Sequence, residues 1–280
     1  MKASLNKTLL LVLMCLCLFG CSKALVKEPT EPVLTAAPVE GESFSIPDIN
    51  LDMLWCKPGK FMMGSPKDEK GREGNEAQHE VTLTKGFYLG KYEVTQEQWE
   101  KVMGSSPSYF KGATLPVEKV SWEDAMKFCE KLTQMEKAAG RLPEGYAYTL
   151  PTEAQWEYAC RAGTTTAYSF GDKITPKQAN FDRNVGETTV VGTYSANAWG
   201  FHDLHGNVRE WCSDWYGDYP SGSVSDPFGP SDGSRRVVRG GSWFYFGGDL
   251  LSAGRDRYAP GGRDGRLGFR LSLQTAKRTE

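Results

Sequence analysis

Apolar residues recur at helical spacing in the first half of the chain, behind residues that can cap a helix. Between 125 and 132 the apolar positions follow the period of one helix face, and the capping-box pair Ser121 and Asp124 stands before them. Thr95 can cap a shorter helix that Gly104 closes. The sequence therefore predicts two helices in this half, a short one followed by a longer one.

A third helix is predicted from Thr152, with Gln155 at the capping-box position and Gly163 as the stop. Short β-rich runs predict strands elsewhere. These strands are Glu80–Leu83, Phe87–Tyr92, Val237–Arg239 and Phe269–Leu273. Most of the sequence after Gly163 has neither helical nor strand periodicity. An irregular stretch of this length indicates a functional surface.

The first residues indicate export. Lys2 and Lys7 precede an apolar run, Leu9–Phe19, that is too short to span a bilayer comfortably. The run ends in Phe-Gly-Cys, which is similar to the lipobox at which bacterial lipoproteins are acylated and cleaved. We therefore expect residues 1–20 to be a removed signal peptide and Cys21 to carry lipid. An ordinary cleaved signal is the alternative.

Lipid on Cys21 would set the location, because several acyl chains on one residue anchor a protein stably in a membrane. Residue 22 is serine, not aspartate, so retention at the inner membrane is not indicated. The sequence predicts a lipid-anchored protein of the bacterial cell envelope, at the outer membrane surface. Residues 21–48, with four prolines among small and polar residues, are expected to form an extended tether.

Residues 49–275 have the length of a single domain, and their charge restricts what they bind. The formal net charge of the chain is -2, and losing the two lysines of residues 1–20 lowers it to -4. Without a basic excess, nucleic acid is not an expected partner. The 31 glycines and eight tryptophans indicate a loop-rich domain with aromatic packing.

The cysteines and histidines of this domain allow more than one interpretation. The cysteines are Cys56, Cys129, Cys160 and Cys212. They could form two disulfides in an oxidising compartment, or remain free and buried. His202 and His205 are spaced weakly like a metal pair, and two partly exposed loop histidines are the favoured alternative.

A series of motifs in the domain resembles a known family. In order, the motifs are Phe61–Ser65, Tyr88–Thr95, Pro116–Trp122, Leu150–Ala159, Gly206–Trp211, Arg239–Trp243 and Leu267–Arg270. Together they resemble the formylglycine-generating-enzyme, or sulfatase-modifying-factor, domain over nearly all of residues 50–275. The resemblance implies an α+β, C-type-lectin-like fold with few helices, small antiparallel sheets and much irregular structure.

The resemblance also implies cofactors, which the residues here support unequally. The family's oxidase chemistry uses two copper-holding cysteines after the Gly-Gly-Ser motif, whereas this chain has no cysteine after Cys212. We therefore expect no catalytic residues and no required cofactor. A calcium site of the family implies Asp203, Gly206, Val208 and Glu210 as ligands here. The alternative is that Glu210 and Asn207 only brace the Gly-Asn turn.

Residues 244–270 have a distinctive composition, because they contain no Lys, Glu, Gln, Met or Trp. A codon with two variable bases and a pyrimidine at the third can encode Phe, Tyr, Ser, Asp, Gly or Arg, but none of those five. This pattern resembles the variable proteins of diversity-generating retroelements, which carry variable residues on a lectin-like framework near the C-terminus.

The resemblance implies that this part of the chain consists of framework residues and variable residues, with the variable region at about 244–266. The framework residues would be Arg239, Gly240, Gly241, Ser242, Trp243, Ser252, Ala253, Arg255, Pro260, Arg263, Gly268, Phe269 and Arg270. The candidate variable, ligand-binding residues are Phe244, Tyr245, Phe246, Gly248, Asp249, Gly254, Asp256, Arg257, Tyr258, Ala259, Gly262, Asp264, Gly265 and Arg266. At least one residue of the run Phe244–Phe246 should be exposed, because alternate side chains of an extended chain face opposite ways. A packed core is the alternative.

Three functions follow from these features. The favoured one is a non-enzymatic binding module, a surface lipoprotein that offers a diversified site to an unknown protein or other surface ligand. The second is an enzyme with altered chemistry, for which the best residues are Asp203, His202, His205 and Glu210. The third is a structural lipoprotein of the envelope.

Overall fold

The computed structural model describes residues 37–276, which contain the three predicted helices. They are α1 (Gln96–Met103), α2 (Trp122–Ala138) and α3 (Glu153–Arg161), and each begins with a complete capping box at the predicted residue. Only the stop of α3 differs, because Ala162 adopts the left-handed conformation, with φ 47°, one residue before the predicted Gly163. Within this described range, no helix has both the length and the apolar character that a bilayer crossing requires.

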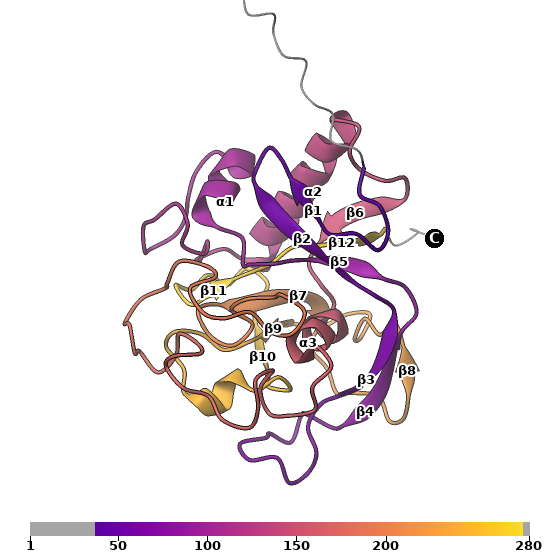
Figure 1. Cartoon of the computed structure of the whole chain (residues 1–280), viewed down its shortest axis with the longest axis vertical. Coiled ribbons are helices and arrows are strands. Elements are labelled where there is room, and N and C mark those ends of the chain that lie inside the picture. Colours follow the sequence, from indigo (N-terminus) through magenta and orange to yellow (C-terminus); the bar gives the residue numbers. More distant parts are fainter. Residues whose placement is uncertain (1–36, 277–280) are drawn as a thin grey trace, which may run out of the picture. The chain divides into compact units, whose positions relative to one another are not determined.

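The first sheet has five antiparallel strands in the order β1-β2-β5-β12-β6. They are β1 (Phe44–Ile46), β2 (Leu51–Cys56), β5 (Phe87–Gly90), β12 (Ser272–Thr275) and β6 (Tyr146–Thr149). The last strand in the described range, β12, therefore lies inside the sheet, between β5 and β6. Helix α2 packs against β6, and α1 packs against α2 (Figure 1).

Two smaller sheets complete the domain, in the orders β10-β9-β7-β11 and β3-β4-β8. Their strands are β3 (Gly59–Met63), β4 (His79–Leu83), β7 (Arg209–Trp215), β8 (Val224–Ser225), β9 (Arg236–Arg239), β10 (Arg255–Tyr258) and β11 (Leu267–Gly268). Helix α3 contacts β7 and β9, and a short 3₁₀ helix, η1 (Gly247–Leu250), follows β9 (Figure 1). The predicted α+β class is confirmed.

The chain between β11 and β12 differs from the single strand predicted over Phe269–Leu273. The carbonyl of Phe269 accepts a hydrogen bond from the N–H of Val94 at 2.9 Å, and that of Leu271 accepts one from Gly90 at 2.8 Å. This segment crosses from the sheet that contains β11 to the first sheet, which contains β12. Its residues therefore cannot all pair within one sheet. The strand predicted over Phe87–Tyr92 is likewise shorter, because β5 ends at Gly90.

Aromatic side chains fill the space between the helices and the sheets. The Trp99 ring stacks on Phe128 with centroids 5.5 Å apart, and both rings contact the edge of Phe269. Each such side chain removes about 150–250 Å² from water, so these contacts dominate the stability of the core. The four domain cysteines are free and buried, as in the second of the two alternatives, and form no disulfide with each other. Burial raises the pKa of each thiol.

Candidate functional site

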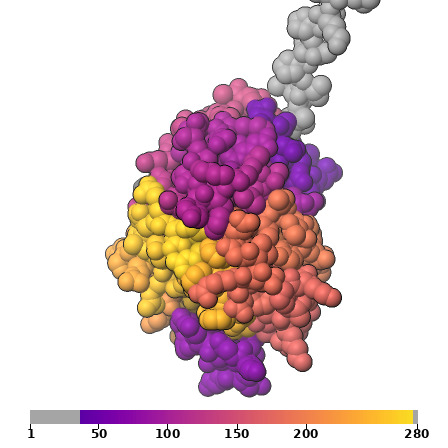
Figure 2. All heavy atoms as spheres, turned by 90° about the vertical axis from the view of Figure 1, so that its left-hand side faces the viewer, coloured from indigo at the N-terminus to yellow at the C-terminus, as the bar shows by residue number. Residues whose placement is uncertain are grey.

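The segment 243–266 covers one face of the domain, which we call the C-terminal face. Figure 2 shows it in yellow, bordered by earlier parts of the chain in magenta and orange. The N–H groups of Asp182 and Arg183 each donate at 2.7 Å, to the carbonyls of Tyr245 and Trp243 respectively. The face therefore combines the C-terminal segment with loops from distant parts of the sequence.

Buried residues hold this segment in place. Gly240 and Gly241 turn the chain out of β9 with φ of 90° and 68°, a region that favours glycine. Arg255 forms a buried ion pair with Glu153 at 2.8 Å. The buried framework residues are Arg239, Gly240, Gly241, Ser242, Ser252, Ala253, Arg255, Gly268, Phe269 and Arg270. Of the others, Trp243 and Pro260 are half-buried and Arg263 is exposed.

The candidate ligand-binding residues lie differently, because none of the fourteen is buried. Phe246 is 61% exposed, whereas Phe244 and Tyr245 are half-buried. The prediction that at least one residue of this aromatic run is exposed is confirmed. A packed core does not account for the run.

Three arginines lie against the aromatic rings of this face. The guanidinium of Arg183 is 3.8 Å from the centroid of Phe244, and that of Arg266 is 4.7 Å from it. Arg209 lies 4.8 Å from the centroid of Tyr245 and 5.4 Å from that of Tyr258. Each cation–π contact of this kind contributes about 0.5–1 kcal/mol at an exposed site, so the arginines favour these positions of the rings.

Two ion pairs order the charged residues of the face. Arg209 Nη1 lies 2.7 Å from an oxygen of Asp256, and Arg266 lies 2.5 Å from Asp264. Hydrogen bonds from the Arg266 side chain hold the pKa of Asp264 below its usual value. Asp264 and Arg266 therefore carry opposite charges at neutral pH and compensate each other.

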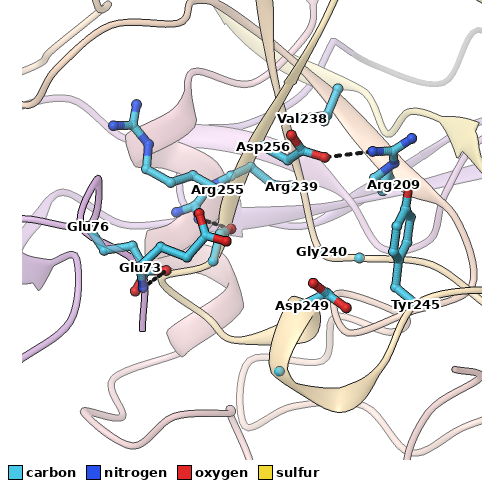
Figure 3. A pocket seen from close by; sticks show the side chains of 13 residues that line it. Glu73, Glu76, Arg209, Val238, Arg239, Gly240, Tyr245, Asp249, Arg255 and Asp256 are labelled. Atoms are coloured by element: carbon cyan, nitrogen blue, oxygen red, sulfur yellow. Dashed lines mark hydrogen bonds and ion pairs between the residues drawn. The ribbon is translucent and has the colours of Figure 1, made fainter. Parts of the chain in front are cut away.

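The face contains two hollows. The inner cavity, of about 190 Å³, is lined by Tyr245, Asp249, Asp256, Glu73, Arg209 and Arg239 among others. Figure 3 shows Arg209 and Tyr245 on one side of it and Glu73 with Arg255 on the other. The more open outer groove, of about 440 Å³, is lined by Tyr109, Phe110, Lys119, Trp243, Phe244 and residues 263–266. Candidate variable residues line both hollows.

The predicted calcium ligands lie behind this face, around an arginine. Both oxygens of Glu210 accept hydrogen bonds from Arg270 at 2.7 Å, and Asp203 accepts one from the N–H of Gly192 at 2.6 Å. Burial raises the pKa of Asp203 to about 6. Because Arg270 already satisfies Glu210, the donor set suits a brace better than a calcium ion. Calcium binding itself stays a prediction.

Gly206 and Val208, the other two predicted ligands, also act as braces, together with the neighbouring Asn207. The N–H of Val208 donates to Glu93 at 3.0 Å, and the N–H of Gly206 donates to the carbonyl of Gly240 at 2.8 Å. The Asn207 amide donates to Glu93 at 2.6 Å. The alternative interpretation, in which this motif holds the Gly-Asn turn, fits these contacts.

The two histidines proposed for altered chemistry do not face a common point. His205 is buried, with Nδ1 2.7 Å from the Leu250 carbonyl and Nε2 3.6 Å from Cys160 Sγ. Burial lowers its pKa to about 4. His202 lies with Nδ1 2.8 Å from the Tyr194 carbonyl, and burial lowers its pKa as well. Among residues 37–276, no group of three or more His, Cys, Asp or Glu side chains is arranged to hold a metal ion.

Several residues of the C-terminal face were not predicted from the sequence. Arg183, Tyr109, Phe110 and Glu73 come from loops without a recognisable pattern. Arg209 stands in the Gly-Asn-Val-Arg-Glu-Trp motif, which marks the position as part of the site region but gives no role. Only the fold brings these residues next to the C-terminal segment.

Residues 48–275 match the sulfatase-modifying factor enzyme 1-like domain family, so the chain belongs to that family. The serine/threonine-protein kinase pkn1 of Chlamydia caviae is 34% identical over 265 residues, which cover 89% of this chain and 42% of that protein. A formylglycine-generating enzyme of Streptomyces coelicolor is 34% identical over 194 residues, covering 62% of this chain and 57% of the enzyme. The chain thus spans about half the length of these relatives.

Among solved structures, Treponema denticola variable protein 1 is similar, with a TM-score of 0.72 and 30% identity. The match covers 82% of this chain and 98% of that one. The predicted C-type-lectin-like fold is thereby confirmed. So is the resemblance to the variable proteins of diversity-generating retroelements, carried on a domain of the formylglycine-generating-enzyme type.

Proposed function

We propose that this protein is a ligand-binding variable protein, held outside the cell by lipid on Cys21, whose C-terminal face is diversified by a retroelement. The observation that carries this proposal is the separation of the segment into two classes. The candidate variable residues are all accessible to solvent, whereas most of the framework residues between them are buried. Substitutions at the accessible positions would change the surface while leaving the buried framework side chains in place.

The glycines of the segment support the same division. A Cβ atom at Gly248 would meet nothing within 4 Å, and one at Gly265 would lie 3.5 Å from the Glu118 carboxylate. At the framework residue Gly268, a Cβ would lie only 2.4 Å from the Val117 carbonyl oxygen. These two positions proposed to vary can accept a side chain, whereas this framework position cannot.

The chemistry of the face suits the binding of a protein or another surface ligand. Aromatic and arginine side chains supply most of the energy at interfaces, because they offer large contact areas at low entropic cost. Here Phe244 and Tyr245 stand between the inner cavity and the outer groove. A ligand could contact the rings and enter either hollow.

The anchor is proposed from the sequence alone. Residues 1–20, Cys21 and the predicted tether up to residue 36 lie outside the described residues. The end of the predicted tether, 21–48, belongs to the domain instead, because β1 pairs with β2 and Ile46 is buried. Labelling cells with an alkynyl fatty acid should mark the protein, and the Cys21→Ala variant should stay unlabelled. Protease treatment of intact cells should then remove the domain, as expected for display at the outer surface.

We propose no catalytic activity, although relatives of this chain include enzymes. The stretch 243–255, where the family's copper ligands would stand, contains no cysteine. The thiols of the domain are buried, so the donors here do not fit a copper ion. Conversion of a cysteine-containing sulfatase peptide, abolished by chelation, would favour the enzyme alternative. Stable co-purification with a large envelope complex would favour a structural role.

Sequencing of the gene in clonal isolates from one culture tests diversification. We expect substitutions to concentrate at the fourteen candidate codons and to spare the framework codons. Substitutions spread evenly along residues 49–275 would sink the proposal. A nearby reverse transcriptase gene with an adenine-marked template repeat would be the independent confirmation.

A further inference from the structure

Arg209 lies outside the C-terminal segment but contacts three of its candidate variable residues. It is the first residue of β7, and its side chain is 5% exposed. Its guanidinium lies against the rings of Tyr245 and Tyr258 and forms an ion pair with Asp256 at 2.7 Å. One scaffold cation therefore sits beneath three positions that are proposed to change.

The guanidinium of Arg209 is only partly satisfied. Its Nη1 donates to Asp256, whereas its Nε is buried and has no hydrogen-bond partner among the described residues. Arg209 and Gly240 line the same inner cavity (Figure 3). A buried N–H without a partner favours any acceptor that can reach it.

We propose that Arg209 is a fixed specificity-determining residue of the variable face, and that residue 256 decides whether its charge is offered to a ligand. With Asp256 present, the charge is neutralised within the protein. With a neutral residue there, the inner cavity becomes a site for an oxyanion, such as a carboxylate, phosphate or sulfate group. The proposal rests on the proposed function only in assuming that position 256 varies.

The volume and geometry of the cavity agree with this ligand class. About 190 Å³ accommodates a carboxylate side chain or a single oxyanion, and the planar guanidinium matches the two oxygens of such a group. Asp249 and Glu73 line the same cavity and oppose an anion. The switch therefore depends on removing the acid closest to Arg209, which is Asp256.

Asp256→Asn is the direct test, because asparagine is also encoded by a codon that ends in a pyrimidine. Phosphate binding to the full chain in detergent micelles is measured by isothermal titration at constant ionic strength. We expect at least tenfold tighter binding by Asp256→Asn than by the unchanged protein. The matched control is Asp249→Asn, which removes one acid from the same cavity but leaves the Arg209 pair in place, and it should not gain this affinity.

Adding Arg209→Met to Asp256→Asn should abolish the gain, and Arg209→Lys should retain only part of it, since lysine lacks the two-pronged geometry. Near-ultraviolet circular dichroism checks the fold of each variant, and the lysine variant serves if the methionine variant unfolds. Equal phosphate affinity in Asp256→Asn and the unchanged protein would overturn the proposal, and so would a gain that survives loss of Arg209. Sequencing decides separately whether position 256 varies, so the two proposals can fail independently.

Discussion

At the scale of single residues, the C-terminal face combines tolerant positions with positions that constrain each other. Glu118 is buried, and its Oε1 accepts hydrogen bonds from the N–H groups of Tyr109 and Phe110. Its Oε2 is buried without a partner among the described residues. That oxygen lies under Gly265, so a side chain introduced there can reach it.

Gly265→Ser should therefore stabilise the domain more than Gly265→Ala. Both variants restrict the unfolded chain, but only serine can donate a hydrogen bond to Glu118, which is worth about 1 kcal/mol. Urea unfolding of the two variants measures the difference. If the serine variant is no more stable than the alanine variant, the unpartnered oxygen is not available to residue 265.

Tyr258 and Gly262 should not vary independently. A Cβ at Gly262 would lie 2.4 Å from the Tyr258 ring, which must then move. We expect Gly262→Ala to cost about 1–3 kcal/mol next to Tyr258, as overpacking usually does, and much less in a Tyr258→Ala background. A double-mutant cycle measures the coupling, and additive effects would contradict it.

Asp203 should make stability depend on pH in the acidic range. Its folded pKa of about 6 lies above the ordinary value of 3.8, so the folded state favours the protonated carboxyl. The resulting contribution to the free energy of unfolding is complete below pH 3.8 and is lost as the pH rises through 6. At one pKa unit per 1.36 kcal/mol, this amounts to about 3 kcal/mol. Stability measured from pH 4 to 7 should be flatter in Asp203→Asn, whereas the exposed control Asp232→Asn should keep the original profile.

At the scale of elements, local signals were predictable from the sequence and long-range pairings were not. The capping boxes at Thr95, Ser121 and Thr152 lie within a few residues of the helices they begin, so the sequence shows them directly. The crossing at 269–271 depends on partners at Gly90 and Val94, far away in the sequence. The same holds for the C-terminal face: its own segment was predicted from the sequence, whereas its neighbours Arg183 and Arg209 were not.

The crossing between the two sheets depends on the buried pair of Arg270 and Glu210. Replacing Arg270 with methionine leaves the Glu210 carboxylate buried without its countercharge, which should cost about 3–5 kcal/mol. Arg263 pairs with Asp124 at the surface, and its side chain is 51% exposed. Arg263→Met is therefore the matched control, with an expected effect below about 1 kcal/mol. If urea unfolding showed the same loss of unfolding free energy in both variants, the buried pair would contribute no more to stability than the surface pair.

At the scale of the whole molecule, the fold separates the supporting sheet and helices from the C-terminal face that we propose binds a ligand. The first sheet and its helices contain no candidate variable residue, whereas η1, β10 and the loops beside them contain all fourteen. The relatives of this chain carry different names, among them a serine/threonine-protein kinase, a formylglycine-generating enzyme and a variable protein. The function of this chain must therefore be inferred from the residues of the C-terminal face and not from the fold alone.

Truncation after Leu271, which removes β12, should prevent cooperative folding, since β5 and β6 would lose the strand that joins them. Removal of only residues 277–280 leaves β12 complete and should keep the fold. Protease resistance and near-ultraviolet circular dichroism compare the two products. A protease-resistant product without β12 would contradict this role for the last strand.

The interior position of β12 has a consequence for the proposed diversification. The strand is encoded downstream of every candidate variable codon, so a frameshift or premature stop among them yields a chain that cannot complete its sheet. Codons that end in a pyrimidine never specify a stop, so mutagenesis confined to the first two bases avoids that loss. Under the proposed diversification, any chain with a complete first sheet has therefore been translated in frame through every candidate variable codon.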